Sequence, residues 1–347
     1  MITSALNTFS QWFLHHESFA GYIEPIIQTI KPSYRAGYYR AQVKNIQLKP
    51  DDYLQLELKP QRGWSGFIAG QHLNLTVEMN GRLLTRVFTI ASSVADYKIN
   101  GCIRLLIKTT AHTRFTSQLI TYLAKGDWCN ISPAMGGFVF KPSAQPVVFI
   151  AAGSGITPII AMLKQHLANV SEKTKLVYYA KVNMHQLVTE LQQLAQLHTH
   201  FSYVLLTRND ASDITSDINI SEKPDIYCCG PNGFMDVVRV FATKHQLTYY
   251  QEAFGLTLPP IEDENIFSLQ IGALTHQVSS TEPLLNQFEK QNIAAKRGCG
   301  IGICHQCQCV KKSGIVRNLK TGELSDNGEQ LIQLCISQPL SDLEIKA

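Results

Sequence analysis

The sequence has little net charge and no long basic run. It contains 31 lysine and arginine residues against 27 acidic ones, which gives a formal net charge of +4 over 347 residues. Proteins that bind nucleic acid usually carry a strongly basic face, so this balance argues against DNA or RNA as a partner. Internal repeats and low-complexity tracts are also missing, which argues against a repeat architecture.

The cysteines do not suit a disulfide framework, because their number, nine, is odd. A secretory signal pattern is also missing, so we expect a reducing, cytoplasmic compartment, where clustered thiols more often bind metal than pair. The apolar, uncharged segment 146–163 is interrupted by Gly153, Gly155 and Pro158. We therefore interpret it as a buried strand that turns into a helix, and we predict no membrane span.

The hydrophobic pattern changes four times along the chain, which predicts a multidomain protein of β and α/β class. Residues 1–35 indicate short apolar helices, and residues 36–142 alternate in short segments typical of an antiparallel β-barrel. In residues 143–254 strands and helices alternate, which predicts a Rossmann-like parallel α/β domain. A proline-rich acidic linker (255–265) then leads to a third unit (266–347), which begins with a hairpin.

The C-terminal unit contains a glycine-rich cysteine loop, "KRGCGIGICHQC". Its cysteines are spaced C-x4-C-x2-C, and a fourth follows after a further 27 residues. The four are Cys299, Cys304, Cys307 and Cys335. This spacing is typical of the plant-type [2Fe–2S] cluster, and glycines beside the cysteines let backbone amides approach the sulfurs.

Two other interpretations of the loop are a zinc site and inert buried thiols. Zinc sites usually consist of two short cysteine pairs rather than one glycine-rich loop, so the pattern favours the cluster. Cys309 is left over, and we expect it to be a small buried hydrophobic residue. The segment from Ile266 to Ala347 resembles the plant-type ferredoxin domain, and this resemblance implies a β-grasp fold.

A phosphate-binding turn is predicted at "GSGITP", where a strand leads into a helix. Gly153 and Gly155 supply backbone amides, and Thr157 is expected as the helix N-cap with Pro158 at the first helical position. Helix N-termini and glycine amides hold phosphates. The third glycine of the dinucleotide fingerprint is missing, so the turn alone does not identify a nucleotide site.

Five further motifs resemble those of the ferredoxin–NADP reductase superfamily. They are "AGQHL" (69–73), "RVFTIAS" (86–92), "GGF" (136–138), "YCCGPNGFM" (227–235) and "YYQEAF" (249–254). Their order also resembles that of the superfamily, with a flavin barrel before a nucleotide domain. Together with the cysteine loop, the chain resembles the reductases that supply electrons to oxygenases and membrane fatty-acyl desaturases.

The resemblance implies roles for the flavin residues. Arg86 would neutralise a flavin phosphate, Phe88 would pack on the isoalloxazine ring, and the Thr89 hydroxyl would hydrogen-bond near N5. Phe88 stands where the family has tyrosine, so the phenol hydrogen bond is lost but the aromatic face is kept. Thr89 stands where the family has serine, so the hydroxyl is kept. Thr116 matches a second phosphate loop, which implies FAD rather than FMN.

The resemblance also implies a site where nicotinamide meets the flavin. Cys229 and Gly230 match the family's Cys-Gly-Pro, and Glu252 and Phe254 match its Glu-x-Phe. Thr89, Cys229 and Glu252 are therefore the residues expected at the point of hydride transfer.

The choice between NADPH and NADH depends on cations after the second and third strands of the nucleotide domain. Lys181 and Arg208 occupy these places, and an acid that would repel a 2′-phosphate is missing, so NADPH is favoured. The alternative is that Lys181 is a solvated loop lysine.

Together these features predict electron transfer from NAD(P)H through FAD to the cluster and then to a partner enzyme. The apolar N-terminal segment favours a membrane fatty-acyl desaturase as the partner, with contact at the inner membrane surface; the same segment could instead pack on the barrel. The alternatives are the reductase component of a ring-hydroxylating oxygenase or monooxygenase, and a redox-sensing binding protein.

Overall fold

The computed structural model describes residues 19–34, 39–50, 52–109, 115–207, 218–253, 264–298, 300–302 and 306–346. The chain divides into two compact units. The first comprises Met1–Leu83, Phe88–Cys229 and Val238–Gln251, and the second comprises Leu84–Val87, Gly230–Val237 and Glu252–Ala347. The N-terminal helix α2 spans Phe19–Ile30. None of the helices in the described part of the chain has the length and apolar character needed to cross a membrane.

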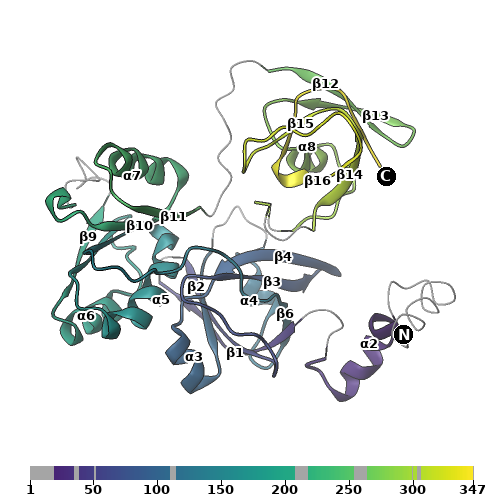
Figure 1. Cartoon of the computed structure of the whole chain (residues 1–347). Coiled ribbons are helices and arrows are strands. Elements are labelled where there is room, and N and C mark those ends of the chain that lie inside the picture. The colour runs from purple at the N-terminus through teal and green to yellow at the C-terminus, as the bar shows by residue number, and fades with distance from the viewer. Residues whose placement is uncertain are drawn as a thin grey trace, which may run out of the picture. The chain divides into compact units, whose positions relative to one another are not determined.

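The first sheet is a six-stranded β-barrel with strand order β4-β3-β6-β1-β2-β5 (Figure 1). Its strands are β1 (Tyr39–Lys49), β2 (Tyr53–Pro60), β3 (His72–Met79), β4 (Arg82–Thr89), β5 (Ile103–Lys108) and β6 (Trp128–Ile131). Pairs β1–β2, β1–β6, β2–β5 and β3–β6 are antiparallel. Asn80 and Gly81 join β3 to β4 with φ of 52° and 70°, as a tight Asn-Gly hairpin turn requires. The predicted antiparallel barrel is confirmed.

Two short helices accompany the barrel, α3 (Val94–Asn100) and α4 (Leu119–Tyr122). Helix α3 begins at a capping box, in which the Ser93 hydroxyl accepts from the Asp96 amide and the Asp96 carboxylate accepts from the Ser93 amide. This reciprocal pair satisfies two of the amides that a helix start leaves unpaired.

The second sheet has five strands in the order β11-β10-β7-β8-β9. They are β7 (Val147–Ala152), β8 (Thr174–Ala180), β9 (Phe201–Thr207), β10 (Asp225–Gly230) and β11 (Tyr249–Ala253). Pairs β10–β7, β7–β8 and β8–β9 are parallel. Figure 1 shows α5 (Ile156–His166) and α6 (Val188–Leu197) on one face and α7 (Asn232–Lys244) on the other. The predicted parallel α/β architecture is confirmed.

Helix α6 begins at Val188, although the pattern predicts a helical stretch from Met184. Asn183 and Leu187 adopt left-handed backbone conformations, with φ of 61° and 63°. The ring Nε2 of His185 lies 3.1 Å from Tyr178 O and 3.0 Å from Leu206 O. These contacts hold the segment as a turn between β8 and β9, so the helix starts later.

The barrel and the parallel sheet share one hydrophobic core. Tyr53 and Leu106 of the barrel belong to the same buried cluster as Phe149 and Tyr178 of the parallel sheet. Gly70 has φ of 101°, and a Cβ there would lie 2.1 Å from Phe138 O. Only glycine fits this close approach, which brings the "AGQHL" and "GGF" motifs into contact.

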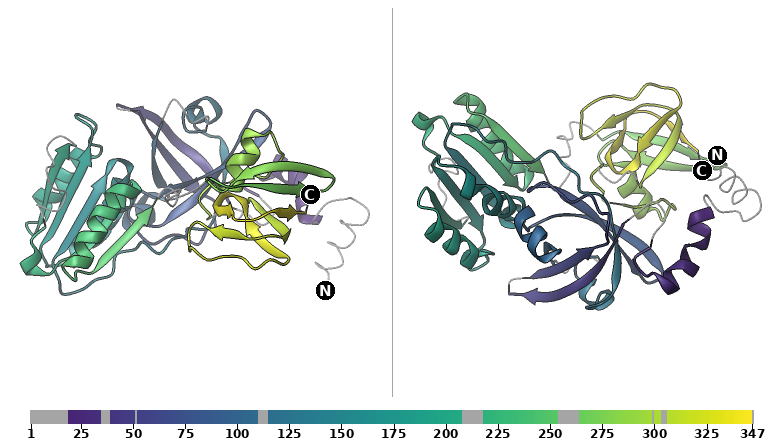
Figure 2. Two further views of the ribbon diagram at one scale, coloured as in Figure 1. Left: turned by 90° about the horizontal axis from the view of Figure 1, so that it is seen from above. Right: turned by 60° about the horizontal axis from the view of Figure 1, so that its bottom comes forward.

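The C-terminal strands, coloured green to yellow in Figure 2, form a sheet. Its strand order is β13-β12-β18-β14-β16, and β15 and β17 form a separate pair. The strands are β12 (Ile266–Ile271), β13 (Leu274–Ser279), β14 (Gln308–Ser313), β15 (Val316–Asn318), β16 (Gln330–Gln333), β17 (Ser337–Pro339) and β18 (Leu343–Ile345). Strands β12 and β13 form the predicted antiparallel hairpin, and helix α8 spans Leu284–Lys290. The core of this unit contains Cys307 and Cys335.

Candidate functional site

Three motifs that are predicted to bind flavin lie far apart in the sequence and are joined by hydrogen bonds in the structure. The backbone oxygen of Gln71 accepts from the Ile90 amide at 3.0 Å, which joins "AGQHL" to "RVFTIAS". The His72 and Met135 backbones exchange two hydrogen bonds, of 2.9 and 2.8 Å, and Gln71 Nε2 donates to Gly136 O at 3.2 Å. The pattern of motifs is therefore also a spatial cluster.

Phe88 presents an aromatic face in this cluster. Its ring stacks on Phe115, with centroids 6.1 Å apart and planes inclined by 25°. Phe115 is buried and Phe88 is only partly buried. Phe115 directly precedes Thr116, so the stack links the strand motif to the predicted second phosphate loop. No sequence pattern singled out Phe115, although it is the neighbour of Thr116.

The Thr89 hydroxyl fits a bound flavin. Thr89 is 6% exposed, and its Oγ1 is buried with no hydrogen-bond partner in the described structure. A buried hydroxyl without a partner is unfavourable unless a ligand satisfies it. The neighbouring Arg86 is half-buried, and its Nη1 donates to Thr85 O at 2.8 Å and to Gly298 O at 3.0 Å. The roles of both residues toward FAD remain predictions.

The predicted nucleotide residues lie at the carboxyl edge of the parallel sheet. Gly153 and Gly155 form the turn after β7, and Cys229 and Gly230 end the neighbouring strand β10, where Cys229 pairs with Ala151. The carboxyl ends of parallel strands are where ligands bind in open α/β sheets. Cys229 is fully buried, with 0% exposure.

Thr157 does not cap helix α5 as expected. The helix begins at Ile156 with Gly155 as its N-cap, after a short 3-10 turn. The Thr157 hydroxyl instead donates to Ser154 O at 2.9 Å. Gly153, with φ of 56°, starts the turn early. The N-cap therefore lies two residues before the expected position, and Pro158 is the third helical residue rather than the first.

Lys181 and Glu252 lie on either side of these strands. Lys181 is exposed directly after β8, and Glu252 is half-buried on β11. Arg208 and Phe254 fall outside the described residues, as do Cys299 and Cys304.

Cys307 and Cys335 come together although 27 residues separate them in the sequence. Each is 2% exposed. The Cys335 amide donates to Cys307 Sγ at 3.4 Å, and the Gly302 amide donates to Cys335 Sγ at 3.2 Å. Gly300 and Gly302 have φ of 78° and 75°, and the left-handed conformation at Gly302 accompanies the amide that donates to Cys335 Sγ. Such hydrogen bonds stabilise thiolate ligands and tune a cluster's potential.

Arg297 lies within electrostatic reach of this cysteine pair. Burial lowers the pKa of its guanidinium, while the Cys335 sulfur acts in the opposite direction. Its Nη1 also pairs with Glu289. Cys309 is half-buried, and burial raises the pKa of its thiol to about 12, as expected for an unreactive packing residue.

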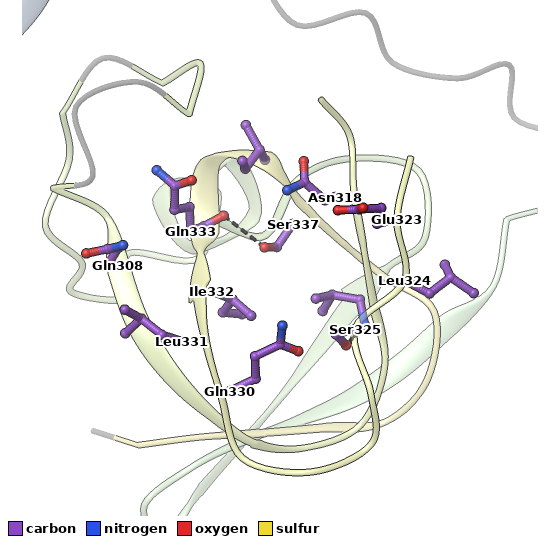
Figure 3. Close-up of a pocket in the computed structure, with 12 residues that line it drawn as sticks. Gln308, Asn318, Glu323, Leu324, Ser325, Gln330, Leu331, Ile332, Gln333 and Ser337 are labelled. Carbon is purple, nitrogen blue, oxygen red and sulfur yellow. Dashed lines mark hydrogen bonds between the residues drawn. The ribbon is translucent and has the colours of Figure 1, made fainter. Parts of the chain in front are cut away.

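A polar pocket of about 160 Å³ is lined by residues that neighbour the two cysteines in the sequence (Figure 3). Gln308 follows Cys307, while Gln333 and Ile336 flank the segment that contains Cys335. Gln333 Nε2 is buried and has no partner in the part of the chain that the structure describes. Leu324 and Leu331 border the pocket and are 60% and 59% exposed.

Comparisons with known proteins agree with this arrangement. Residues 44–140 match the oxidoreductase FAD-binding domain, and residues 149–240 match the oxidoreductase NAD-binding domain. An NADPH oxidoreductase of Mycobacterium tuberculosis is 24% identical over 90% of this chain and 85% of its own length. The glycine betaine monooxygenase reductase subunit of Pseudomonas aeruginosa is 25% identical, covering 80% of this chain and 87% of its own length.

The phthalate dioxygenase reductase of Burkholderia cepacia is 22% identical over 88% of this chain and 96% of its own length. Among solved structures, a phthalate dioxygenase reductase, described as modular for electron transfer from pyridine nucleotides to [2Fe–2S], has a TM-score of 0.62. It is 21% identical, covering 90% of this chain and 98% of that one. The chain therefore carries an oxidoreductase FAD-binding domain followed by an oxidoreductase NAD-binding domain and is an NAD(P)H-dependent oxidoreductase, and the domain order and the relatives are consistent with the ferredoxin–NADP reductase superfamily.

Proposed function

We propose that this chain is the reductase component of an oxygenase system. It takes a hydride from NAD(P)H at FAD, passes electrons to a [2Fe–2S] cluster and delivers them to a terminal oxygenase. The cluster ligands are Cys299, Cys304, Cys307 and Cys335, held in a C-terminal β-grasp ferredoxin domain. The observation that carries the proposal is that backbone amides donate hydrogen bonds to the sulfurs of Cys307 and Cys335, in the same chain as the two cofactor domains.

FAD, when bound, joins a two-electron donor to a one-electron acceptor, because it accepts a hydride and releases electrons singly. The protein's part is to hold and orient. The Thr89 hydroxyl would hydrogen-bond the flavin ring, Phe88 would pack on its face, and Arg86 would neutralise a phosphate. The glycine turn after β7 binds the nucleotide phosphates, and Cys229 and Glu252 border the nicotinamide. Positioning of this kind can supply several kcal/mol, roughly 7–11, of a barrier.

We propose an oxygenase as the partner instead of the expected desaturase. The relatives are named as reductases of monooxygenases and dioxygenases, and a desaturase or membrane contact has no support among them. The desaturase expectation depended on the apolar N-terminal segment, where Ile26 and Ile30 of α2 are 66% and 87% exposed. An exposed apolar helix fits a protein partner as well as a lipid surface, so apolar character alone did not discriminate. What helix α2 contacts remains a prediction.

The pocket bordered by Leu324 and Leu331 is the surface that we propose binds the oxygenase. Electron transfer needs the acceptor close to the cluster, and the pocket adjoins Cys307 and Cys335 along the chain. Exposed leucines around a polar pocket resemble the mixed character of transient protein interfaces. Glu323 adds an acidic group, which suits a basic patch on the acceptor.

The test is to purify the chain anaerobically and count its cofactors. We expect one FAD with about two irons and two sulfides per chain, as the cysteine spacing implies. Cys335→Ser should remove the cluster and leave flavin reduction by NAD(P)H intact, whereas the matched change Cys309→Ser should leave the iron content unchanged. A full cluster in the Cys335 variant, or wild-type protein without iron, would refute the ligand assignment.

A further inference from the structure

Four charged side chains form a continuous network between the barrel and the parallel sheet. Arg104 of β5 holds Glu190 of α6 at both nitrogens, with Nη1–Oε1 at 2.5 Å and Nη2–Oε2 at 3.0 Å. Lys164 of α5 lies 3.6 Å from Glu190 Oε2 and 2.7 Å from Asp96 Oδ2 of α3. Charges alternate along the row, so each cation contacts an anion from another element.

The network is partly shielded from water. The side chains of Arg104 and Glu190 are 16% and 25% exposed. Burial opposes ionisation of Glu190, but the hydrogen bond and charge of Arg104, followed by those of Lys164, more than offset it and lower the pKa of this carboxyl. A bidentate pair at such a site fixes direction as well as distance, which an exposed pair does not.

The same residues reach the predicted cofactor motifs. Arg104 Nη2 donates to Ala91 O at 3.0 Å, and its amide donates to Ser92 Oγ at 3.1 Å. These residues end the "RVFTIAS" motif, two and three positions after Thr89. On the other side, Lys164 stands on α5, the helix that begins directly after the "GSG" turn.

The helix is tied to the barrel a second time. Gln165, next to Lys164 on α5, accepts from the Val94 amide through its Oε1 at 3.0 Å. Val94 is the first residue of α3, the helix that carries Asp96. The contact of α5 with the barrel side therefore involves both a backbone amide and a charged pair.

We propose that Arg104, Glu190, Lys164 and Asp96 are positioning residues that set the distance between the nucleotide-binding edge and the flavin strand during hydride transfer. The proposal rests on the NAD(P)H-to-FAD step of the proposed function. Hydride transfer requires near-contact of two rings, so a displacement of the two motifs slows it steeply. Because the four residues lie outside the motifs predicted to hold the flavin and the nucleotide, they act on the rate through geometry and not on the chemistry of the flavin.

Stopped-flow reduction of the flavin by NAD(P)H under anaerobic conditions tests the proposal, with rates expressed per bound flavin. Glu190→Gln should slow reduction about tenfold, since small misplacements cost up to about a hundredfold. Nucleotide affinity should stay within about twofold, because the site itself is intact. Arg104→Lys keeps the charge but loses the bidentate geometry. Its rate of flavin reduction should therefore lie between those of the wild type and Glu190→Gln.

Lys173→Met is the matched control. Lys173 pairs with Glu222 at 2.8 Å on the parallel-sheet side alone, and it is 78% exposed, so this variant should reduce its flavin at the wild-type rate. Lys164→Met gives an independent test if Glu190→Gln does not fold. Wild-type rates per bound flavin in Glu190→Gln or Lys164→Met would overturn the inference. A wild-type protein whose flavin is not reduced by NAD(P)H would instead overturn the proposed function.

Discussion

Substitution of Thr89 by valine should change stability in opposite directions with and without FAD. Valine keeps nearly the same shape and removes only the hydroxyl. In the protein without ligand, Thr89 Oγ1 is buried and has no partner in the described structure. With FAD bound, the same hydroxyl is predicted to hydrogen-bond the flavin ring.

The magnitudes follow from these two environments. Leaving a buried hydroxyl unpaired costs about 1–3 kcal/mol, so the apoprotein of Thr89→Val should unfold with a free energy higher by up to that amount. A satisfied hydrogen bond contributes a net of about 0.5–1.5 kcal/mol, so the FAD-loaded protein should lose about that amount of unfolding free energy. The two changes add around the thermodynamic cycle, so FAD binding should weaken by about 1.5–4.5 kcal/mol, roughly ten- to two-thousandfold. The rate of flavin reduction should fall with it, because the ring loses one orienting contact.

The assay is unfolding by urea of the apoprotein and of the FAD-loaded protein, followed by the fluorescence of the first unit. Titration of the apoprotein with FAD gives the affinity. Thr174→Val is the control, because the Thr174 hydroxyl is buried and donates to Glu172 O at 3.2 Å. That change should destabilise both forms. If Thr89→Val weakens the apoprotein and leaves FAD affinity unchanged, the hydroxyl has a protein partner and the flavin assignment is wrong.

Three further predictions concern cofactor choice, pH and docking. Lys181→Glu should raise the KM for NADPH by about tenfold or more and change that for NADH little, because a carboxylate repels the 2′-phosphate; equal changes would remove the support for NADPH. Burial opposes ionisation of Asp96 and Glu190, but Lys164 and Arg104 respectively more than offset it, so both folded-state pKa values are lowered. Their contribution to stability is therefore full above the ordinary carboxyl pKa of about 4 and is lost as pH falls through the lowered values; the acid-induced loss of unfolding free energy should be smaller in Glu190→Gln, and an unchanged pH profile would contradict this. Leu331→Glu should lower transfer to the oxygenase at least about fivefold, as for an interface anchor worth more than about 1 kcal/mol, while ferricyanide reduction stays at the wild-type rate; an equal fall in both would place the effect inside the protein.

The sequence pattern was sufficient for the architecture of the first unit. Alternating segments predicted the barrel strands, and the alternation of strands and helices predicted a parallel sheet, because side-chain periodicity follows directly from burial. It missed β6, whose four residues are too few for a visible alternation. Helix α3 was also missed, although "SVAD" at 93–96 carries the capping-box signal.

The candidate site was less accessible to sequence reasoning. Cysteine spacing singled out Cys307 and Cys335, and they lie together in the structure, but their full ligand role stays a prediction. The amide of Gly302 that donates to Cys335 has no side chain by which a pattern could identify it. Arg104 and Glu190 are 86 positions apart, and a pairing at that separation depends on the folded topology rather than on any local pattern.

The two transfers in the proposed reaction place different demands on the protein. A hydride moves only between groups in near-contact, whereas a single electron can cross a longer gap between separate centres. In the first unit, accordingly, barrel and parallel sheet share a buried core, and a charged network joins them. The C-terminal core is built from its own residues, Leu269 to Ile345. Substitutions in the network should therefore slow reduction of the flavin, while the cluster of the same variants, reduced directly by dithionite, should keep its spectrum and its transfer to an acceptor. Loss of both would mean that the network supports the fold as a whole rather than the geometry of one step.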